Sequence, residues 1–297
     1  MPELTEVERV RKTLSPAMRS KIICMNKSEA TSVLRTSEFS LAGKVINSVR
    51  RHGKYLIFDL STKGSPAYML SHLGMTGTWS LDDSKEWRPY LHFQLELVKE
   101  GKKLWLSYTD RRRFGNIFLV RSKARLNTLG PDMLSKSFNK EWVDFGISQY
   151  PKKELKPFLM MQYYFPGLGN YMASEVCARA CILPTRKLKM LSKKDTDALW
   201  EAIKEVVRIG MEEKGLPYKR YKHLAGARSL GGNCNGCKWF STCQDSFGVE
   251  GNTKACNEFE DKLLLVYKHE RCERCGSKVK NVEQDKRMSW FCKKCQK

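Results

Sequence analysis

Apolar positions at the start of the chain follow the period of a helix. They lie three or four residues apart, so their side chains fall on one face. These positions are Leu4, Val7, Val10 and Leu14. From 44 to 120 the pattern changes to short apolar runs and apolar–polar alternation, broken by Gly, Asp and Ser. Such runs are typical of antiparallel strands, so the pattern predicts a leading helix and then a β-sandwich or barrel.

The second half of the chain has helical periodicity. A short helix fits 155–162, a glycine-rich loop fits 167–170 and a second helix fits 171–180. Glycines let a backbone approach phosphate, and the N–H groups that open a helix attract anions. A plain helical hairpin explains the same spacing. A longer helix follows, for which Ser192 and Asp195 form a predicted capping box.

Breaks in these patterns predict an α+β multidomain protein. We expect an N-terminal β-sandwich catalytic domain with its leading helix at 2–132, and then a linker with some helix at 133–150. A helix–two-turn–helix domain is expected at 151–229, a cysteine-rich insert at 230–260 and a zinc finger at 261–297.

Basic residues strongly outnumber acidic ones. The chain has 54 Lys and Arg against 32 Asp and Glu, which gives a formal net charge of +22. Such an excess favours a polyanionic partner, because neutralising phosphates releases counterions. A membrane surface is the competing partner, but the chain has neither a long apolar run nor a secretory leader. We therefore expect an intracellular protein of the nucleoid or nucleus that binds nucleic acid and no membrane.

Cysteine spacing predicts a zinc site near the end of the chain. The pairs Cys272-x2-Cys275 and Cys292-x2-Cys295 are separated by sixteen residues, as in structural four-cysteine zinc sites. The residues between the pairs predict a two-stranded finger with Arg287 near its tip. Since such a site has no open coordination position, its role is folding and positioning.

A second cysteine group lies in a Gly- and Asn-rich stretch. Its members are Cys234, Cys237, Cys243 and Cys256. A second metal site is one interpretation, with His223 or His269 as a replacement ligand and an iron–sulfur cluster as another option. Unordered, reduced cysteines in a flexible insert are the alternative.

The first residues of the chain include candidate catalytic groups. If Met1 is removed, Pro2 presents a secondary amine, and α-amino groups titrate at about 7.7–8.0. An amine that attacks an aldehyde-level carbon forms a Schiff base, which from proline is a cationic iminium. Glu3 is the adjacent proton donor or acceptor. The alternative is structural: Pro2 starts a helix, and Glu3 and Glu6 complement its dipole.

Two loops in the strand region combine unusual residues. In 72–77 two glycines flank Met75, and in 110–115 three arginines precede Phe114. Cationic side chains beside an apolar side chain are typical of a wedge, a group of residues that enters a nucleic-acid groove and fills a gap in the base stack. A core-filling methionine and a solvated arginine loop are the alternatives.

A series of motifs occurs in one order along the chain. They are Pro2-Glu3-Leu4 with Glu6 and Glu8, Arg51-His52-Gly53-Lys54-Tyr55-Leu56, His72 to Gly77, Arg112-Arg113-Phe114-Gly115, Leu129-Gly130-Pro131, Gly167-Leu168-Gly169-Asn170-Tyr171 with Glu175, and the terminal four-cysteine finger. In these motifs the chain resembles the formamidopyrimidine-DNA glycosylase/endonuclease VIII family over nearly its whole length.

The resemblance implies a bifunctional DNA glycosylase and AP lyase of base excision repair. Such an N-glycosyl hydrolase removes oxidised bases through a proline Schiff base and then cuts the strand by β,δ-elimination. By this likeness Pro2 is the nucleophile at the sugar C1′, Glu3 assists ring opening, and Lys54 holds a flanking phosphate and passes protons. A catalytically silent damaged-DNA-binding protein on the same scaffold is the alternative function.

The resemblance also implies a monomer that binds damaged double-stranded DNA, with single-stranded DNA as a further candidate partner. The implied DNA-binding residues are His72, Met75, Arg112, Arg113, Phe114, Lys156, Asn170 and Arg287. Asn170 and Arg287 would hold phosphates. Met75, Arg112 and Phe114 would fill the space left by the everted nucleotide. These three residues favour oxidised purines over oxidised pyrimidines as the lesion.

The sequence departs from the family pattern in two places. Thr5 replaces a second proline, which matters little to the amine. The insert at 230–260 falls between the long helix and the finger, where bacterial enzymes of the family have a mobile loop that covers 8-oxoguanine. We hypothesise that the insert replaces that loop and alters the range of lesions.

Overall fold

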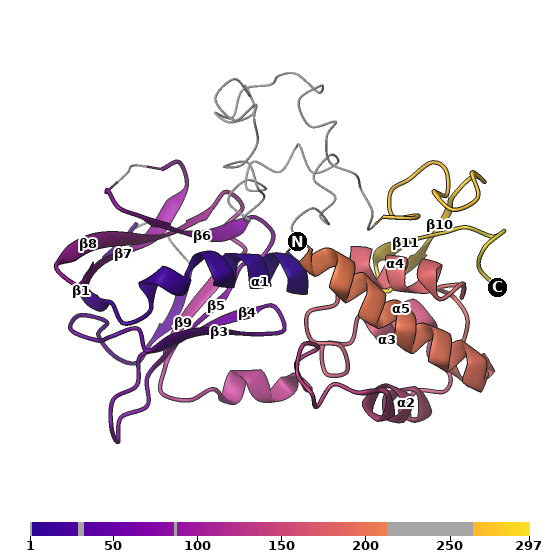
Figure 1. Ribbon diagram of the computed structural model, residues 1–297, viewed down its shortest axis with the longest axis horizontal. Coiled ribbons are helices and arrows are strands. Elements are labelled where there is room, and N and C mark those ends of the chain that lie inside the picture. Colours follow the sequence, from indigo (N-terminus) through magenta and orange to yellow (C-terminus); the bar gives the residue numbers. More distant parts are fainter. Residues whose placement is uncertain (1, 29–32, 86–87, 213–263) are drawn as a thin grey trace. The chain divides into compact units, whose positions relative to one another are not determined.

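The computed structural model describes residues 2–28, 33–85, 88–212 and 264–297. The described chain forms two compact units (Figure 1). Unit 1 comprises the described residues up to 127, and unit 2 comprises 128–212 and 264–297. The cysteine-rich insert, with its four cysteines and His223, lies outside the described residues.

Unit 1 begins with the predicted helix. Helix α1 spans Leu4–Thr13, and its apolar face is fully buried at Leu4, Val7 and Val10. The Glu6 carboxylate accepts the backbone N–H of Glu3 at 2.8 Å, which caps the first turn. The helix therefore begins where the apolar spacing predicted it.

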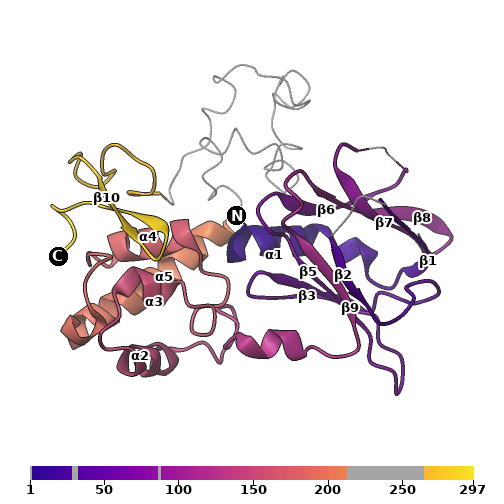
Figure 2. The same ribbon diagram turned by 180° about the vertical axis from the view of Figure 1, so that it is seen from behind.

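Two sheets follow α1 (Figures 1 and 2). The first is antiparallel, with the order β1-β7-β8-β6. Its strands are β1 (Lys21–Lys27), β6 (Gly77–Asp82), β7 (Leu91–Lys99) and β8 (Lys102–Asp110). The second has the order β2-β9-β5-β4-β3, and all its pairs are antiparallel except β2 with β9. Its strands are β2 (Leu34–Ser37), β3 (Ser48–His52), β4 (Tyr55–Asp59), β5 (Tyr68–His72) and β9 (Asn116–Val120).

The two sheets share one hydrophobic core with α1. Trp79 on β6 packs against Phe58 on β4 of the other sheet, with ring centroids 5.4 Å apart. Its indole N–H donates to the Ser71 hydroxyl on β5 at 2.9 Å, so the buried indole nitrogen has a partner. The predicted N-terminal β-sandwich is confirmed. The expectation that strands begin only at Lys44 was wrong, since β1 and β2 precede it.

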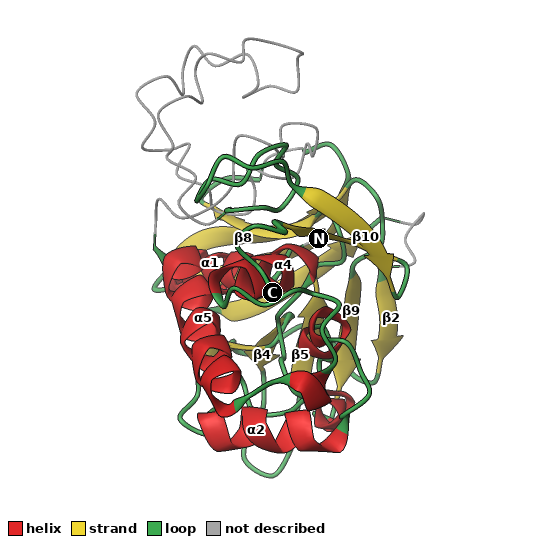
Figure 3. Cartoon of the chain, turned by 90° about the vertical axis from the view of Figure 1, so that its right-hand side faces the viewer, coloured by secondary structure: helices red, strands yellow, loops and turns green. Residues whose placement is uncertain are grey.

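The described part of unit 2 is built from four α-helices and a hairpin (Figure 3). The helices are α2 (Lys140–Gln149), α3 (Leu155–Leu159), α4 (Asn170–Arg179) and α5 (Lys193–Met211). Helix α4 contacts α3, α5 and the hairpin. The predicted capping box of α5 is present, because Ser192 and Asp195 each accept the other's backbone N–H. None of the helices among the described residues is long and apolar enough to cross a membrane.

Helix α2 lies within the segment 133–150, where a linker with some helix was expected. Its Val143 is fully buried, so this stretch also contributes to the unit's core. Helix α3 ends at Leu159, although the apolar spacing continued to Gln162. The Gln162 side chain instead bridges the following loop: it donates to the Leu168 carbonyl at 2.8 Å and accepts the Gly167 N–H at 3.1 Å.

The hairpin carries Arg287 beside its tip, as the sequence predicted. Strands β10 (Lys280–Gln284) and β11 (Arg287–Phe291) pair in antiparallel register, with Arg287 opposite Gln284. Asp285 and Lys286 connect them with φ values of 45° and 59°. Two successive positive φ values are typical of a type I′ turn.

Candidate active site and nucleic-acid interface

Pro2 and Glu3 occupy a fixed position at the start of α1. Both are buried, and Glu3 is only 2% exposed. The Thr5 hydroxyl donates to the same Glu6 carboxylate oxygen that caps the Glu3 backbone. Since the next turn of the helix is anchored in the core, the backbone beside Pro2 has a defined place.

Lys54 lies in the turn between β3 and β4, and this turn is bonded to α1. The Arg51 guanidinium donates to the Glu8 carboxylate at 3.1 Å and to the Gly53 carbonyl at 3.0 Å. Glu8 also forms an ion pair with Arg11 at 2.7 Å. Gly53 has a φ of +56°, which glycine adopts without strain. Lys54 itself is 7% exposed. These contacts fix the β3–β4 turn against the helix that carries Pro2 and Glu3.

His72 is an uncharged residue beside Lys54. Burial, together with the positive charge of Lys54, lowers the pKa of His72 to about 4. Its Nδ1 accepts the Gly74 N–H at 3.1 Å, and its ring lies 5.0 Å from that of Tyr55. The imidazole is therefore neutral at neutral pH and carries its hydrogen on Nε2.

The two loops expected to form a wedge lie at the surface of unit 1. Met75 is in the turn between β5 and β6 and is partly exposed. The Arg112 guanidinium lies 4.8 Å from the centre of the Phe114 ring, which is 52% exposed. Arg113 between them is exposed and has a left-handed backbone, with a φ of 56°. An exposed arginine stacked on an aromatic ring is available for contact with a base or a phosphate.

In unit 2, Lys156 is buried and its amine contacts three protein oxygens. The side chain is 1% exposed. It donates to Asn170 Oδ1 at 2.7 Å, the Met288 carbonyl at 3.0 Å and Ser289 Oγ at 2.8 Å. This placement differs from that of a surface lysine that contacts phosphate. Lys156 instead connects α3, the first residue of α4 and strand β11.

Asn170 opens α4 directly after the glycine loop. Its Oδ1 faces Lys156, and its Nδ2 lies 3.5 Å from the Tyr267 hydroxyl. Gly167 in the loop has a φ of +104°, a conformation that favours glycine. Arg287 is exposed and precedes the two residues of β11 that accept from Lys156. One buried amine thus contacts Asn170 directly and the two residues that follow Arg287.

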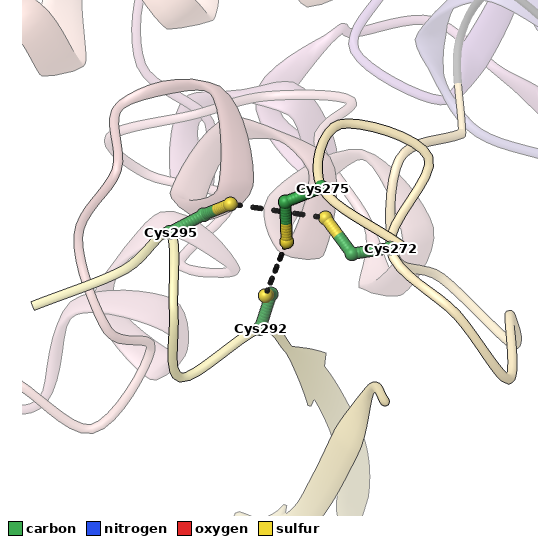
Figure 4. A group of neighbouring side chains, drawn as sticks. All are labelled: Cys272, Cys275, Cys292 and Cys295. Atoms are coloured by element: carbon green, nitrogen blue, oxygen red, sulfur yellow. Dashed lines mark hydrogen bonds between the residues drawn. The ribbon is translucent and has the colours of Figure 1, made fainter. Parts of the chain in front are cut away.

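The four terminal cysteines converge on one point (Figure 4). Their sulfur atoms all lie within 4.8 Å of one another. Cys272 and Cys295 have sulfurs 4.0 Å apart, and Cys275 and Cys292 have theirs 3.5 Å apart. Sulfurs about 2.3 Å from a tetrahedral zinc ion would be about 3.8 Å apart, so the cluster fits such an ion.

Glu175 has a structural role that the sequence reasoning missed. Its fully buried carboxylate accepts backbone N–H groups from Leu265, Val266 and Tyr267, at 2.6 to 3.0 Å. Burial raises its pKa to about 7, against the opposing effect of these hydrogen bonds. The available signal was a glutamate among the apolar and small residues 172–178 of α4. This contact attaches the segment that leads into the cysteine cluster to α4.

Comparison with protein families identifies the chain. The N-terminal domain of formamidopyrimidine-DNA glycosylase matches residues 1–117, and the H2TH domain of the same enzyme matches residues 129–220. The chain belongs to the formamidopyrimidine-DNA glycosylase family. The formamidopyrimidine-DNA glycosylase of Histophilus somni strain 2336 is 31% identical over 306 residues, which cover 100% of both chains.

Solved structures of the family have the same fold as this chain. The Lactococcus lactis protein in complex with DNA that contains an abasic site is 25% identical, with a TM-score of 0.73 and 99% of each chain covered. The Thermus thermophilus protein is 27% identical, also with a TM-score of 0.73, and 99% of this chain and 98% of that chain are covered. The chain is therefore a DNA glycosylase of base excision repair. The alternative of a catalytically silent binding protein is not favoured.

Proposed function

We propose that this glycosylase removes oxidised bases from double-stranded DNA with Pro2 as its nucleophile. The observation that carries the proposal is the buried Pro2–Glu3 pair, which the Glu6 cap holds at the first turn of α1. Removal of Met1 frees the amine. A nucleophile held in a fixed geometry reacts as an intramolecular group does, which lowers the barrier.

The proposed reaction uses one amine for two steps. The Pro2 nitrogen attacks C1′ as the bond to the base breaks, and the base leaves with its electron pair and a proton. Glu3 assists by protonating the sugar ring oxygen as the ring opens. The resulting iminium acidifies the C2′ protons. Loss of one of them expels the 3′ phosphate in β-elimination, and δ-elimination then expels the 5′ phosphate. Lys54, fixed next to α1, binds a flanking phosphate and passes protons.

The proposed wedge offsets the cost of everting the damaged nucleotide. Extrusion of a base from a duplex costs a few kcal/mol. Met75 and Phe114 would replace lost stacking, and Arg112 would bind the orphaned partner base. His72 and Arg113 would contact the DNA backbone next to these three residues. Their combination favours oxidised purines as substrates.

Asn170 and Arg287 are the proposed phosphate contacts of unit 2. The first turn of α4 has backbone N–H groups that favour an anion, and Arg287 is exposed on the hairpin. Because the Lys156 amine has three protein acceptors, we propose that Lys156 positions these two residues rather than binding DNA. The protein acts as a monomer in this proposal.

We propose zinc as the ion of the four-cysteine cluster. Cys272 and Cys275 precede β10, and Cys292 and Cys295 follow β11, so a bound zinc would close the base of the hairpin. When bound it supplies structural cross-linking, because four protein thiolates leave no position for water. The chain's own contribution is the position of Arg287.

A base-excision assay with matched variants tests the proposal. The substrates are duplexes with a single 8-oxoguanine, formamidopyrimidine or thymine glycol. We expect Pro2→Gly and Glu3→Gln to lower the single-turnover excision rate at least about a hundredfold, because the first replaces the rigid secondary amine with a primary amine and the second removes a positioned acid. Glu141→Gln, on α2, is the control and should retain the rate.

The products add a second criterion. β,δ-Elimination leaves a one-nucleotide gap with phosphate at both ends. Wild-type protein that releases no base from any of these duplexes would contradict the proposal. So would a Pro2→Gly variant with the wild-type rate.

A further inference from the structure

Asp110 is a fully buried carboxylate at the base of the two wedge loops. It is the last residue of β8, and its exposed fraction is 0%. Oδ1 accepts the Thr76 hydroxyl at 2.5 Å and the Arg112 N–H at 3.1 Å. Oδ2 accepts the Gly115 N–H at 2.7 Å and lies 3.5 Å from the Tyr108 hydroxyl. One side chain therefore contacts both loops.

The donors are placed beside the wedge residues themselves. Thr76 follows Met75 in sequence, and Gly115 follows Phe114. The third donor is the backbone of Arg112. The Thr76 hydroxyl oxygen also accepts the Arg112 N–H, at 3.0 Å, which links the loops directly. Asp110 thus constrains the backbone next to each of the three wedge side chains.

The loop backbones are also packed against each other without space for a side chain. A Cβ atom on Gly74 would lie 2.4 Å from the Phe114 carbonyl carbon and 2.5 Å from the Gly115 nitrogen. Gly74 has a φ of +67°, so a substitution there would also strain the backbone. The two loops consequently behave as one body, and Asp110 is the polar group that joins them.

The Asp110 backbone is fixed as well. Its N–H donates to the Tyr90 carbonyl at 3.1 Å, and its carbonyl oxygen lies 2.8 Å from His92 Nε2. The backbone that carries the carboxylate is therefore bonded to the start of β7. Asp110 can therefore act as a fixed attachment point for both loops.

We propose that Asp110 is the positioning residue of the wedge. It holds Met75, Arg112 and Phe114 in the geometry that enters the duplex, so that little loop ordering remains for the moment of base eversion. Preorganisation of this kind lowers the entropic cost of forming the complex. Asp110 does not itself touch DNA in this account. The proposal rests on the wedge role assigned to these residues in the proposed function.

Asp110→Asn is the direct test. Asparagine keeps the shape but turns an NH2 group toward the donors, so at least one backbone N–H or the Thr76 hydroxyl loses its acceptor. We expect at least a tenfold slower single-turnover excision of a fully paired lesion. When the nucleotide opposite the lesion has no base, eversion is easier and the loss should shrink to about threefold or less. Borohydride trapping at a ready-made abasic site should be nearly unchanged.

A fluorescence readout separates positioning from general stability. 2-Aminopurine opposite the lesion brightens when the wedge disrupts stacking, and this rise should be slower in Asp110→Asn. Asp82→Asn is the matched control, because Asp82 also ends a strand of unit 1 but pairs with Arg88. Thr76→Val is the second variant, in case Asp110→Asn does not fold. It removes the hydroxyl that bridges Asp110 and Arg112 and should give a smaller loss with the same substrate dependence.

Two results would overturn the proposal. One is an excision rate and a fluorescence rise in Asp110→Asn that equal those of the wild-type protein. The other is an equal loss on the paired, unpaired and abasic substrates, which would make Asp110 a purely structural residue. Failure of the wild-type protein to excise any lesion would instead contradict the proposed function, so the two failures are distinguishable.

Discussion

At the scale of single residues, the protonation state of His72 determines how the Met75 loop begins. The Gly74 N–H donates to His72 Nδ1, and that nitrogen has a free lone pair only in the appropriate neutral form. Protonation would place two donors face to face at the start of the loop. The neighbouring Lys54 and the partial burial of the ring both oppose that protonation.

This arrangement predicts an acid-dependent loss of stability. The folded-state pKa of His72, about 4, is below its ordinary value of 6.5. The contribution of neutral His72 to the free energy of unfolding is therefore fully present above about pH 6.5 and is lost as the pH falls toward 4. By linkage the loss at pH 5 is about 2 kcal/mol. Urea unfolding of wild type and His72→Asn at about pH 7.5 and 5 measures it. Equal pH dependence of the two proteins would contradict this assignment.

At the scale of elements, Lys156 is the main polar link of unit 2. It joins α3 to the start of α4 and to β11 through one buried ammonium group. Gln162 and Glu175 make similar bridges, to the glycine loop and to the segment before the cysteine cluster. The phosphate-binding geometry proposed for unit 2 therefore depends on residues that point inward.

Lys156→Met should weaken both stability and DNA binding. The apolar stem is retained, but three oxygens lose a charged donor, which should lower the free energy of unfolding by about 2–3 kcal/mol. Because Asn170 and Arg287 would lose their common support, we expect at least a tenfold loss of duplex affinity at fixed salt. Lys153→Met is the control, since the Lys153–Asp285 pair is long, at 3.7 Å, and its Asp285 side is exposed, and such surface pairs contribute little. Unchanged affinity in Lys156→Met would show that Lys156 does not position these residues.

The elements that the sequence predicted are those encoded by local patterns. Helix α1 has a continuous apolar face, and α5 has both an apolar face and its own capping box. Strand β1 was missed although residues 22–25 form a short apolar run, because these residues do not alternate with polar ones and only Ile22 is buried. Strand β2 is a short parallel edge strand, stabilised by pairing with the distant β9.

The same contrast applies to the site. The cysteine spacing predicted a cluster that the structure brings together, since coordination chemistry dictates that spacing. The burial of Lys156 and the bond between Asp110 and Thr76 could not be predicted, because in each case a partner comes from a distant part of the chain. A sequence indicates which groups are chemically able to act, whereas tertiary packing determines which of them face solvent.

At the scale of the whole molecule, the proposed function requires the cysteine cluster to support DNA binding through the hairpin. Cys292 directly follows β11, and Cys272 and Cys292 pack with Val266, Val279 and Ala178 of α4 in one small core. Such a small core needs a further cross-link for stability. A bound zinc would provide that cross-link.

Loss of one ligand should therefore remove the metal and the duplex affinity together. We expect Cys292→Ser to lose the zinc of this site and to bind duplex at least tenfold more weakly. Cys24→Ser, in unit 1, should retain both properties. Metal analysis of the pure protein should give at least one zinc per chain. Full affinity in a metal-free Cys292→Ser variant would contradict the structural role of this site.

The central claim is that Pro2 forms a covalent iminium with the sugar, and borohydride trapping tests it most directly. Wild-type protein is mixed with a duplex that contains one abasic site, reduced with borohydride and digested, and the cross-linked peptide is sequenced. We predict an adduct on the peptide that begins at Pro2, and a weaker one with Pro2→Gly, which replaces the secondary amine with a primary amine. An adduct on a lysine such as Lys54, or no adduct despite intact duplex binding, would contradict the assignment of Pro2 as the nucleophile.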